Sequence, residues 1–169
     1  MKYSFEYRFG YKLIYSFGSL IINLLLIMYV IPALMTYEGK FLQILYVFTL
    51  LLFLFFFNRY YFNLYKIMPY KIEADEEKIV CSHFMFSGKI YTIRFEEIDK
   101  LSGGIFDGKV RGLMKVHNQK DGITIGFSHK IHDAKTLETL ILSKVPKKLY
   151  DEVIDKFNIK KESLRKRKK

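Results

Sequence analysis

The run Leu50-Leu51-Leu52-Phe53-Leu54-Phe55-Phe56-Phe57 consists entirely of large apolar residues, and it decides the fold class. A helix made from this run has no polar face to offer water, and a buried helix of a soluble protein rarely needs apolar side chains on every side. The run lies in a longer uncharged stretch, residues 41–58, whose apolar character continues to Tyr65. The sequence therefore predicts a transmembrane helix over about residues 40–65.

A second apolar segment precedes this one. No charged residue occurs in the 25 positions from Leu13 to Tyr37, which at about 1.5 Å per residue easily cross a hydrocarbon core of about 30 Å. The segment is too long for a cleaved signal peptide, and no small-x-small cleavage site follows it before Thr36. Since only a short connection separates the two segments, they predict a transmembrane helical hairpin over residues 13–65, with helices at about 13–36 and 40–65.

The distribution of basic residues orients this hairpin. Six of them flank its two ends, at Lys2, Arg8, Lys12, Arg59, Lys66 and Lys71. The connection offers only Lys40. Basic residues are enriched on the cytoplasmic side of membrane proteins, so we expect both termini in the cytoplasm and the connection outside. The single cysteine, Cys81, agrees with a reducing compartment and excludes an intramolecular disulfide.

Polar and aromatic residues of the hairpin have a regular placement. Ser16, Ser19 and Asn23 share one helical face, and small or weakly polar residues at such spacing mark close helix packing in lipid. We favour this helix-packing stripe over a transport pathway, because no charged residue lies within residues 13–37 or 41–58. Six tyrosines near the segment ends are expected to be interfacial anchors: Tyr11, Tyr15, Tyr37, Tyr60, Tyr61 and Tyr65.

Residues 1–12 form an amphipathic N-terminal segment. Its aromatic residues alternate with other residues, at Tyr3, Phe5, Tyr7, Phe9 and Tyr11. A period of two puts all five rings on one face of an extended strand. Such a strand lies either at the membrane surface or along a cytoplasmic sheet, and the sequence leaves both alternatives open.

The rest of the chain is an ordinary charged sequence, with 22 basic and 15 acidic residues from residue 71 onward. Short alternating segments between turn residues predict strands, at residues 70–74, 78–86, 89–95, 96–101, 110–117 and 123–128. Two helices are expected to follow, one over residues 134–144 capped by Asp133 and one from Pro146 to Asn158. The pattern predicts a cytoplasmic, mainly-β meander or small barrel with C-terminal helices over residues 70–158.

This layout resembles bacterial membrane proteins in which a transmembrane hairpin precedes a pleckstrin-homology-like (PH-like) domain. The matching segments are residues 70–86 with their acidic turn, the run Phe95-Glu96-Glu97-Ile98-Asp99-Lys100-Leu101, and the turn Lys120-Asp121-Gly122. The resemblance implies an α+β fold, in which a seven-stranded, two-sheet PH-like barrel is plugged at one end by a helix, and a bacterial inner-membrane location. The chain departs from the family pattern in the loop over residues 103–108 and in its two C-terminal helices.

The sequence offers no pattern for catalysis or cofactor binding. His129 and His132 lack a third metal ligand, and the glycines fit neither a P-loop nor a dinucleotide fingerprint. The acidic turn over residues 75–77 would repel a phosphate where eukaryotic pleckstrin relatives bind inositol phosphates. Nucleic acid is disfavoured as well, because the basic residues behind the net charge of +11 are scattered or lie in the tail. We therefore expect no catalytic, cofactor-binding or metal-binding residues, no cofactor and no enzymatic activity.

Residues 159–169 form a polybasic tail. Its seven basic residues, against one acid, are Lys160, Lys161, Arg165, Lys166, Arg167, Lys168 and Lys169. Such a run cannot bury a core and is expected to be disordered in isolation. Near a bilayer each basic residue contributes on the order of 1 kcal/mol of attraction to anionic lipid, so we predict that the tail lies on the cytoplasmic leaflet. The alternative is a solvated end with no specific role.

Together these expectations describe a non-enzymatic, membrane-anchored PH-like interaction or scaffold module. It would be a subunit of a membrane complex or an accessory to one, and would bind a protein partner or its own copies. The alternative is an immunity- or resistance-type accessory protein that protects the membrane or a transporter against membrane-active peptides, since that role occurs in similar-looking families.

Overall fold

The computed structural model describes residues 2–85, 87–109 and 111–166, the last six of these by their backbone alone. The chain forms two compact units. Residues 9–65 make up the hairpin unit, and the N-terminal residues to Arg8 together with those from Lys66 onward make up the sheet unit. The sheet unit is therefore assembled from both sides of the hairpin in the sequence.

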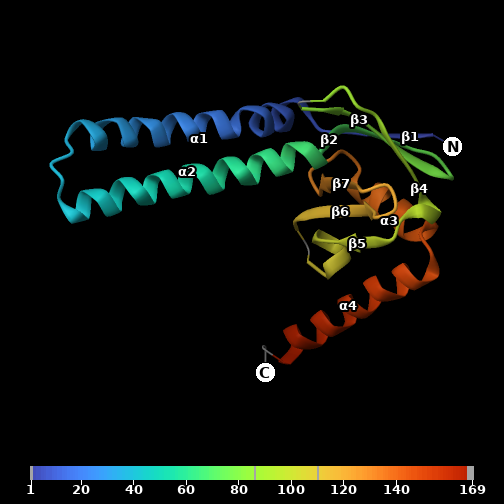
Figure 1. Ribbon diagram of the computed structural model, residues 1–169. Helices are drawn as coiled ribbons and strands as arrows, with labels where there is room; N and C mark the ends of the chain where they lie inside the picture. Colours follow the sequence, from blue (N-terminus) through green and yellow to red (C-terminus); the bar gives the residue numbers. More distant parts are fainter. Residues whose placement is uncertain (1, 86, 110, 167–169) are drawn as a thin grey trace. The chain divides into compact units, whose positions relative to one another are not determined.

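The hairpin unit contains two helices that run side by side, α1 (Phe9–Met35) and α2 (Phe41–Ile67), although the last two residues of α2 belong to the sheet unit (Figure 1). Both helices are long and apolar enough to cross a membrane. Of their described residues, none in α1 is buried and only Leu64 and Tyr65 are buried in α2. The core helices of soluble proteins bury their apolar side chains, so these two helices do not have that character. Both predicted helices are confirmed, although α1 begins earlier than the expected Leu13 and α2 continues to Ile67.

The N-terminal strand β1 (Tyr3–Glu6) belongs to the sheet unit. It pairs antiparallel with β2 (Pro69–Ala74), and Phe5 lies opposite Ile72, with both side chains almost fully buried. Of the two alternatives for this segment, the strand along a sheet is therefore the one that the chain adopts. The prediction that all five aromatic rings share one strand face is wrong for Phe9 and Tyr11. The chain leaves the sheet after the bridge at Tyr7, and α1 begins at Phe9.

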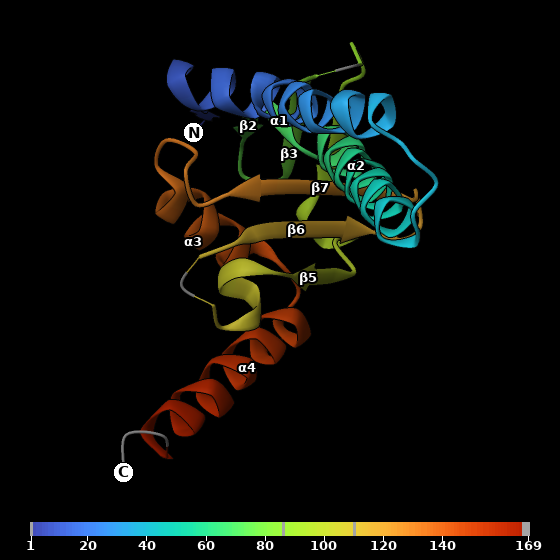
Figure 2. The same cartoon turned by 90° about the vertical axis from the view of Figure 1, so that its left-hand side faces the viewer.

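The sheet unit contains two antiparallel sheets and two further helices (Figure 1). The first sheet has the order β1-β2-β3-β4, with β3 at Lys78–Phe84 and β4 at Tyr91–Arg94. The second has the order β5-β6-β7, with β5 at Lys100–Ser102, β6 at Leu113–Asn118 and β7 at Ile123–Ser128 (Figure 2). The helices are α3 (Ala134–Lys144) and α4 (Lys147–Lys166). This α+β layout agrees with the predicted fold class at that level.

The two sheets do not close into a barrel, and this part of the prediction is wrong. Residues Phe95–Glu97 form a short 3-10 helix, η1, where a strand was expected from residue 96. Phe95 turns into the core, and the Glu97 carboxylate accepts the backbone N–H of Arg94 at 3.2 Å. The ladder of backbone hydrogen bonds is therefore interrupted between β4 and β5, because η1 takes the chain from one sheet to the other.

Other predicted boundaries also differ from the structure. The strand β6 begins at Leu113, so Arg111 and Gly112 of the predicted strand lie outside it, and a second 3-10 helix, η2 (Gly104–Asp107), lies earlier in the chain. Val110, Met1 and Phe86, all in predicted strand segments, lie outside the described residues. Asp133 precedes α3 but makes no capping bond with its side chain, because its backbone is left-handed, with φ of 53°.

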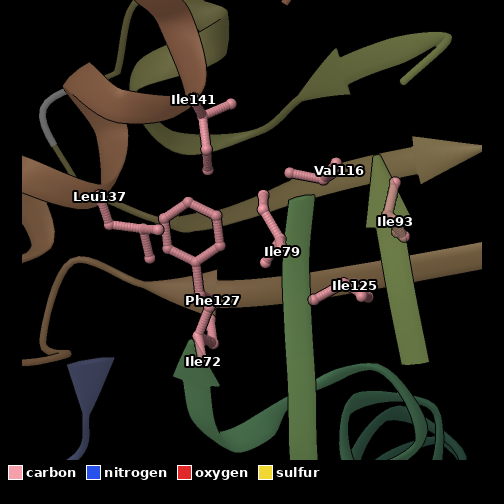
Figure 3. Close-up of a pocket in the computed structure, with 8 residues that line it drawn as sticks. All are labelled: Ile72, Ile79, Ile93, Val116, Ile125, Phe127, Leu137 and Ile141. Atoms are coloured by element: carbon pink, nitrogen blue, oxygen red, sulfur yellow. The ribbon is translucent and has the colours of Figure 1, made fainter. Parts of the chain in front are cut away.

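The core of the sheet unit lies between the two sheets and α3. Its inner side chains come from both sheets and from α3 and point toward one another, namely Ile72, Ile79, Ile93, Val116, Ile125, Phe127, Leu137 and Ile141 (Figure 3). The space left among them is about 10 Å³ and is lined only by apolar groups. A cavity of that size holds at most one water molecule, and an apolar one stays dry. The interior is therefore a packed core and not a ligand cavity.

Candidate functional site

Polar side chains join the two helices of the hairpin unit. Asn23 and Asn58 each donate their side-chain amide to the other's carbonyl oxygen at 2.8 Å, and Asn58 also donates to the Leu54 carbonyl at 2.8 Å. Closer to the start of α1 and the end of α2, the Tyr65 hydroxyl lies 2.8 Å from Ser19 Oγ and 3.1 Å from the Tyr15 carbonyl oxygen. Ser19 and Asn23 of the predicted packing stripe thus make hydrogen bonds to α2, as close helix packing requires.

The third residue of the stripe, Ser16, lies on the same face of α1 and also takes part in an interaction. Gly18, beside the stripe, faces the Tyr61 hydroxyl, to which an added Cβ would lie at 3.7 Å. A Cβ at that distance would make an ordinary van der Waals contact, so Gly18 lies close to the Tyr61 side chain. The packing of α1 on α2 therefore uses a small residue as well as hydrogen bonds.

The six tyrosines expected at the interface do not share one environment. Tyr65 is buried and packs edge-on against Tyr15 and beside Tyr61, so within this unit it acts as a helix-packing residue. Tyr60 and Tyr37 are largely exposed, as an anchor at the headgroup level must be. Tyr11 lies in the first turns of α1.

An apolar groove of about 250 Å³ lies between α1 and α2 next to the connection that joins them. Six side chains line it, namely Leu34, Tyr37, Ile44, Val47, Phe48 and Leu51. Gln43 stabilises the connection beside the groove. Its side chain accepts a hydrogen bond from the Glu38 N–H at 2.8 Å and donates one to the Thr36 carbonyl at 3.2 Å.

A row of three polar side chains crosses the second sheet. The His117 ring on β6 lies 2.8 Å from Ser102 Oγ on β5 through Nε2, and 3.0 Å from Thr124 Oγ1 on β7 through Nδ1. The neighbours of His117 on β6, Val116 and Asn118, are buried, so the row lies on the opposite, outer face of the sheet. Sequence reasoning missed this row, because it arises from the register of three strands.

A serine hydrogen-bonded to a histidine invites comparison with a nucleophile and its base. In hydrolytic triads a carboxylate holds the second ring nitrogen and stabilises the imidazolium that forms. Here that partner is the Thr124 hydroxyl, and partial burial, together with the charges of Lys100 and Lys115, lowers the pKa of His117. These surroundings oppose formation of the imidazolium, so the arrangement suits hydrogen bonding to a ligand better than proton abstraction.

The outer face of this sheet also contacts the last residue of α2. An added Cβ at Gly126 on β7 would lie 3.3 Å from both Cγ1 and Cδ1 of Ile67, so the Ile67 side chain packs closely on the strand at this glycine. Lys115 on β6 is the register partner of Gly126. Lys115, next to the polar row, is therefore close to the residue at which α2 ends.

The remaining candidates for chemistry stand apart from one another. Within the described parts of the chain, no three His, Cys, Asp or Glu side chains are placed to hold a metal ion. His132 Nδ1 lies 3.0 Å from the Asp133 carboxylate, and the Nδ1 atom of His129 is buried without a hydrogen-bond partner in the structure. Cys81 is fully buried, and burial raises the pKa of its thiol, which keeps it protonated and unreactive.

The helix α4 is held to the sheet unit at its N-terminal half. Leu149 and Val153 are buried, and the Lys156 ammonium lies 3.0 Å from Asp107 Oδ1 of η2. The other oxygen of Asp107 accepts the Gly103 N–H at 2.7 Å. Although partial burial opposes it, these two hydrogen bonds lower the pKa of the Asp107 carboxyl. One carboxylate therefore fastens α4 to the loop before β6.

The polybasic tail begins as a continuation of α4. The helix was expected to end at Asn158, but its backbone continues through Lys166, so residues 159–166 are helical rather than disordered. Arg167, Lys168 and Lys169 lie outside the described residues, and the side chains of Lys161, Arg165 and Lys166 are not described. Ile159, just before the basic run, is 69% exposed.

No family model matches this chain, and neither a curated protein nor a solved structure shows significant similarity to it.

Proposed function

We propose that this protein is an integral membrane protein of two spans, in which the hairpin unit holds the sheet unit at one surface of the bilayer. Exposed large apolar side chains occur along the length of both α1 and α2, and each helix is 27 residues long. At about 1.5 Å per residue that length exceeds a hydrocarbon core of about 30 Å. The Asn23–Asn58 pair satisfies polar groups that would otherwise face lipid.

The observation that carries this proposal is the pairing of β1 with β2. These strands precede and follow the hairpin, and Glu6 lies opposite Lys71 in their register. Paired residues of antiparallel strands lie about 5 Å apart, so both must be on the same side of a membrane. Two spans satisfy this requirement, because the chain crosses once through α1 and returns through α2.

The side on which the sheet unit lies follows from charge. Basic residues flank the two hairpin ends that join the sheet unit, whereas the connection carries only Lys40, paired with Glu38. This asymmetry favours a cytoplasmic location for both termini. The resemblance to bacterial membrane proteins with a PH-like domain extends the proposal to a bacterial inner membrane.

We propose further that the sheet unit is a non-enzymatic, PH-like interaction module. A four-stranded and a three-stranded antiparallel sheet around an apolar core, followed by a helix, support the PH-like assignment. The packed core leaves no room for a substrate, and the Ser102–His117–Thr124 row lacks a carboxylate. A protein partner, or a second copy of the chain, would bind the outer surfaces of the sheets. The polybasic tail, which continues α4, would be attracted to anionic lipid.

Cysteine labelling of intact cells tests the topology. We expect a cysteine at Glu38 to react with a membrane-impermeant maleimide from outside, and a cysteine at the exposed Lys78 of β3 to react only after the cells are opened. The native chain is the background control, since Cys81 is fully buried. Protection of position 38 in intact cells would overturn the orientation.

Purification in gentle detergent tests the role as an interaction module. We expect the protein to elute with a partner or as a multimer, and crosslinks to map to the sheet unit. A lone monomer with no crosslinked partner in membranes would contradict the module. An altered sensitivity to membrane-active peptides on deletion would favour the immunity role instead.

A further inference from the structure

We propose that the outer face of the β5-β6-β7 sheet, defined by Lys100, Ser102, Lys115, His117 and Thr124, binds the phosphate groups of anionic lipids in the adjoining leaflet. The inference rests on the proposed membrane anchoring and adds a lipid site on the fold itself, separate from the polybasic tail. Its charge and its closeness to the end of α2 favour a bilayer surface as the occupant.

The charge of this face is complementary to a phosphate diester. Lys100 lies opposite His117 in the register, and Lys115 lies opposite Ser102. Within the described residues neither lysine forms an ion pair. The nearest acids in the sequence are engaged elsewhere, since Asp99 accepts the Gln119 N–H at 2.7 Å and Asp121 accepts the Asn118 side-chain amide at 2.8 Å. Two ammonium groups therefore flank the polar row without a competing carboxylate bond.

The polar row supplies a directed hydrogen-bond donor. A neutral imidazole accepts a hydrogen bond at one nitrogen and donates one from the other, so only one of the two hydroxyls that contact His117 donates to the ring. The other hydroxyl, which accepts from the ring, keeps its own O–H for an incoming acceptor. In either tautomer, one of Ser102 and Thr124 can donate to a phosphate oxygen, and the ring fixes its position.

The position of this face in the chain brings it to the bilayer. Ile67, the last residue of α2, packs on Gly126, and Gly126 is paired with Lys115. Paired residues lie about 5 Å apart, so chain connectivity alone keeps Lys115 close to the point at which α2 leaves the membrane. Headgroup phosphates lie at that level, and each lysine near the surface is attracted to them.

Amine modification of the full chain in lipid nanodiscs, read for each lysine by mass spectrometry, tests this site. We expect Lys100 and Lys115 to react several-fold more slowly in discs that contain phosphatidylglycerol than in discs of phosphatidylcholine alone, with high salt reversing the difference. Lys78 is the internal control, because it is exposed and lies at the end of β3 that pairs with Ala74 rather than with Pro69 near α2. K115Q should abolish the protection of Lys100.

Four outcomes would overturn the inference. Failure of the protein to enter nanodiscs would reject the membrane anchoring and this site with it. Equal modification in neutral and anionic discs would reject the site while leaving the anchoring intact. Equal protection by inorganic phosphate in neutral discs would indicate a site for free phosphate rather than lipid. Loss of protection in a chain truncated after Ile159 would assign the effect to the tail.

Discussion

Asn23 and Asn58 hold each other by two reciprocal hydrogen bonds of 2.8 Å across the hairpin unit. We predict that N23A and N58A each lower the free energy of unfolding of the hairpin by about 1 kcal/mol in detergent or bilayer, because each leaves an amide without its partner. Steric trapping or thermal unfolding followed by circular dichroism would measure this.

A matched control for this pair is T49A. The Thr49 hydroxyl donates to Leu45 within the same helix at 2.7 Å, so its removal breaks no bond between helices. The double variant N23A/N58A should cost less than the sum of the two single variants. Additive costs would show that the two side chains do not stabilise the hairpin through each other.

The N-terminal strand should contribute strongly to the stability of the sheet unit. Phe5 is 2% exposed, whereas Tyr3 on the same strand is 37% exposed. We predict that F5A destabilises the sheet unit by about 3–5 kcal/mol, because removal of a buried Phe ring leaves a cavity, and that Y3A destabilises it far less. Hydrogen exchange of the β2 and β3 amides would report the difference. Equal effects of F5A and Y3A would contradict the observed burial.

Glu138 on α3 should make the sheet unit more stable in acid. Burial raises the pKa of its carboxyl above the ordinary value, although Lys135 partly offsets this. The folded chain then binds a proton more tightly than the unfolded chain, so stability falls as the pH rises from the ordinary pKa through the folded one. E138Q should remove this fall and be more stable than the parent chain at neutral pH, as measured by thermal unfolding. E152Q, at an exposed position of α4, is the control.

Asp107 should have the opposite pH dependence. The pKa of its carboxyl is lowered in the folded chain, so its contribution is present above the ordinary pKa and is lost as the pH falls through the folded value. We predict that D107N loosens α4, seen as faster hydrogen exchange over residues 147–160, and that K156M does the same. The effect of D107N should vanish in acid. An effect that is equal at all pH values would mean that the charge of Asp107 is not what holds α4.

Local patterns sufficed for several elements. The predicted bounds of β7 and α3 agree with the structure, because strict alternation over residues 123–128 and helical spacing over residues 134–144 are each carried by consecutive residues. The helices of the hairpin followed from uncharged length alone. The ends of these helices could not be predicted in this way, because Phe9 continues the alternating pattern of the N-terminal segment but is the first residue of α1.

The features missed by sequence reasoning depend on contacts between distant residues or on competing local forces. The partner of Asn23, and the approach of Ser102 to His117, are set by helix packing and strand register. At Phe95–Glu97, burial of the ring and a bond from Glu97 to the backbone favour a 3-10 turn over a strand. In the tail, Lys, Arg, Glu and Leu are good helix formers, so α4 continues where charge alone suggested disorder.

The pairing of β1 with β2 also sets an order of events during synthesis. Tyr3–Glu6 leaves the ribosome before either helix of the hairpin, whereas its partner Pro69–Ala74 is made only after both helices. In the proposed two-span topology, a nascent chain whose second helix failed to return across the bilayer would leave the two strands in different compartments, with Phe5 and Tyr7 uncovered and the edge of β2 open. The first sheet would thus be complete only in a correctly inserted chain. A misinserted chain would expose the edge of β2, and quality-control proteases would recognise it by that edge.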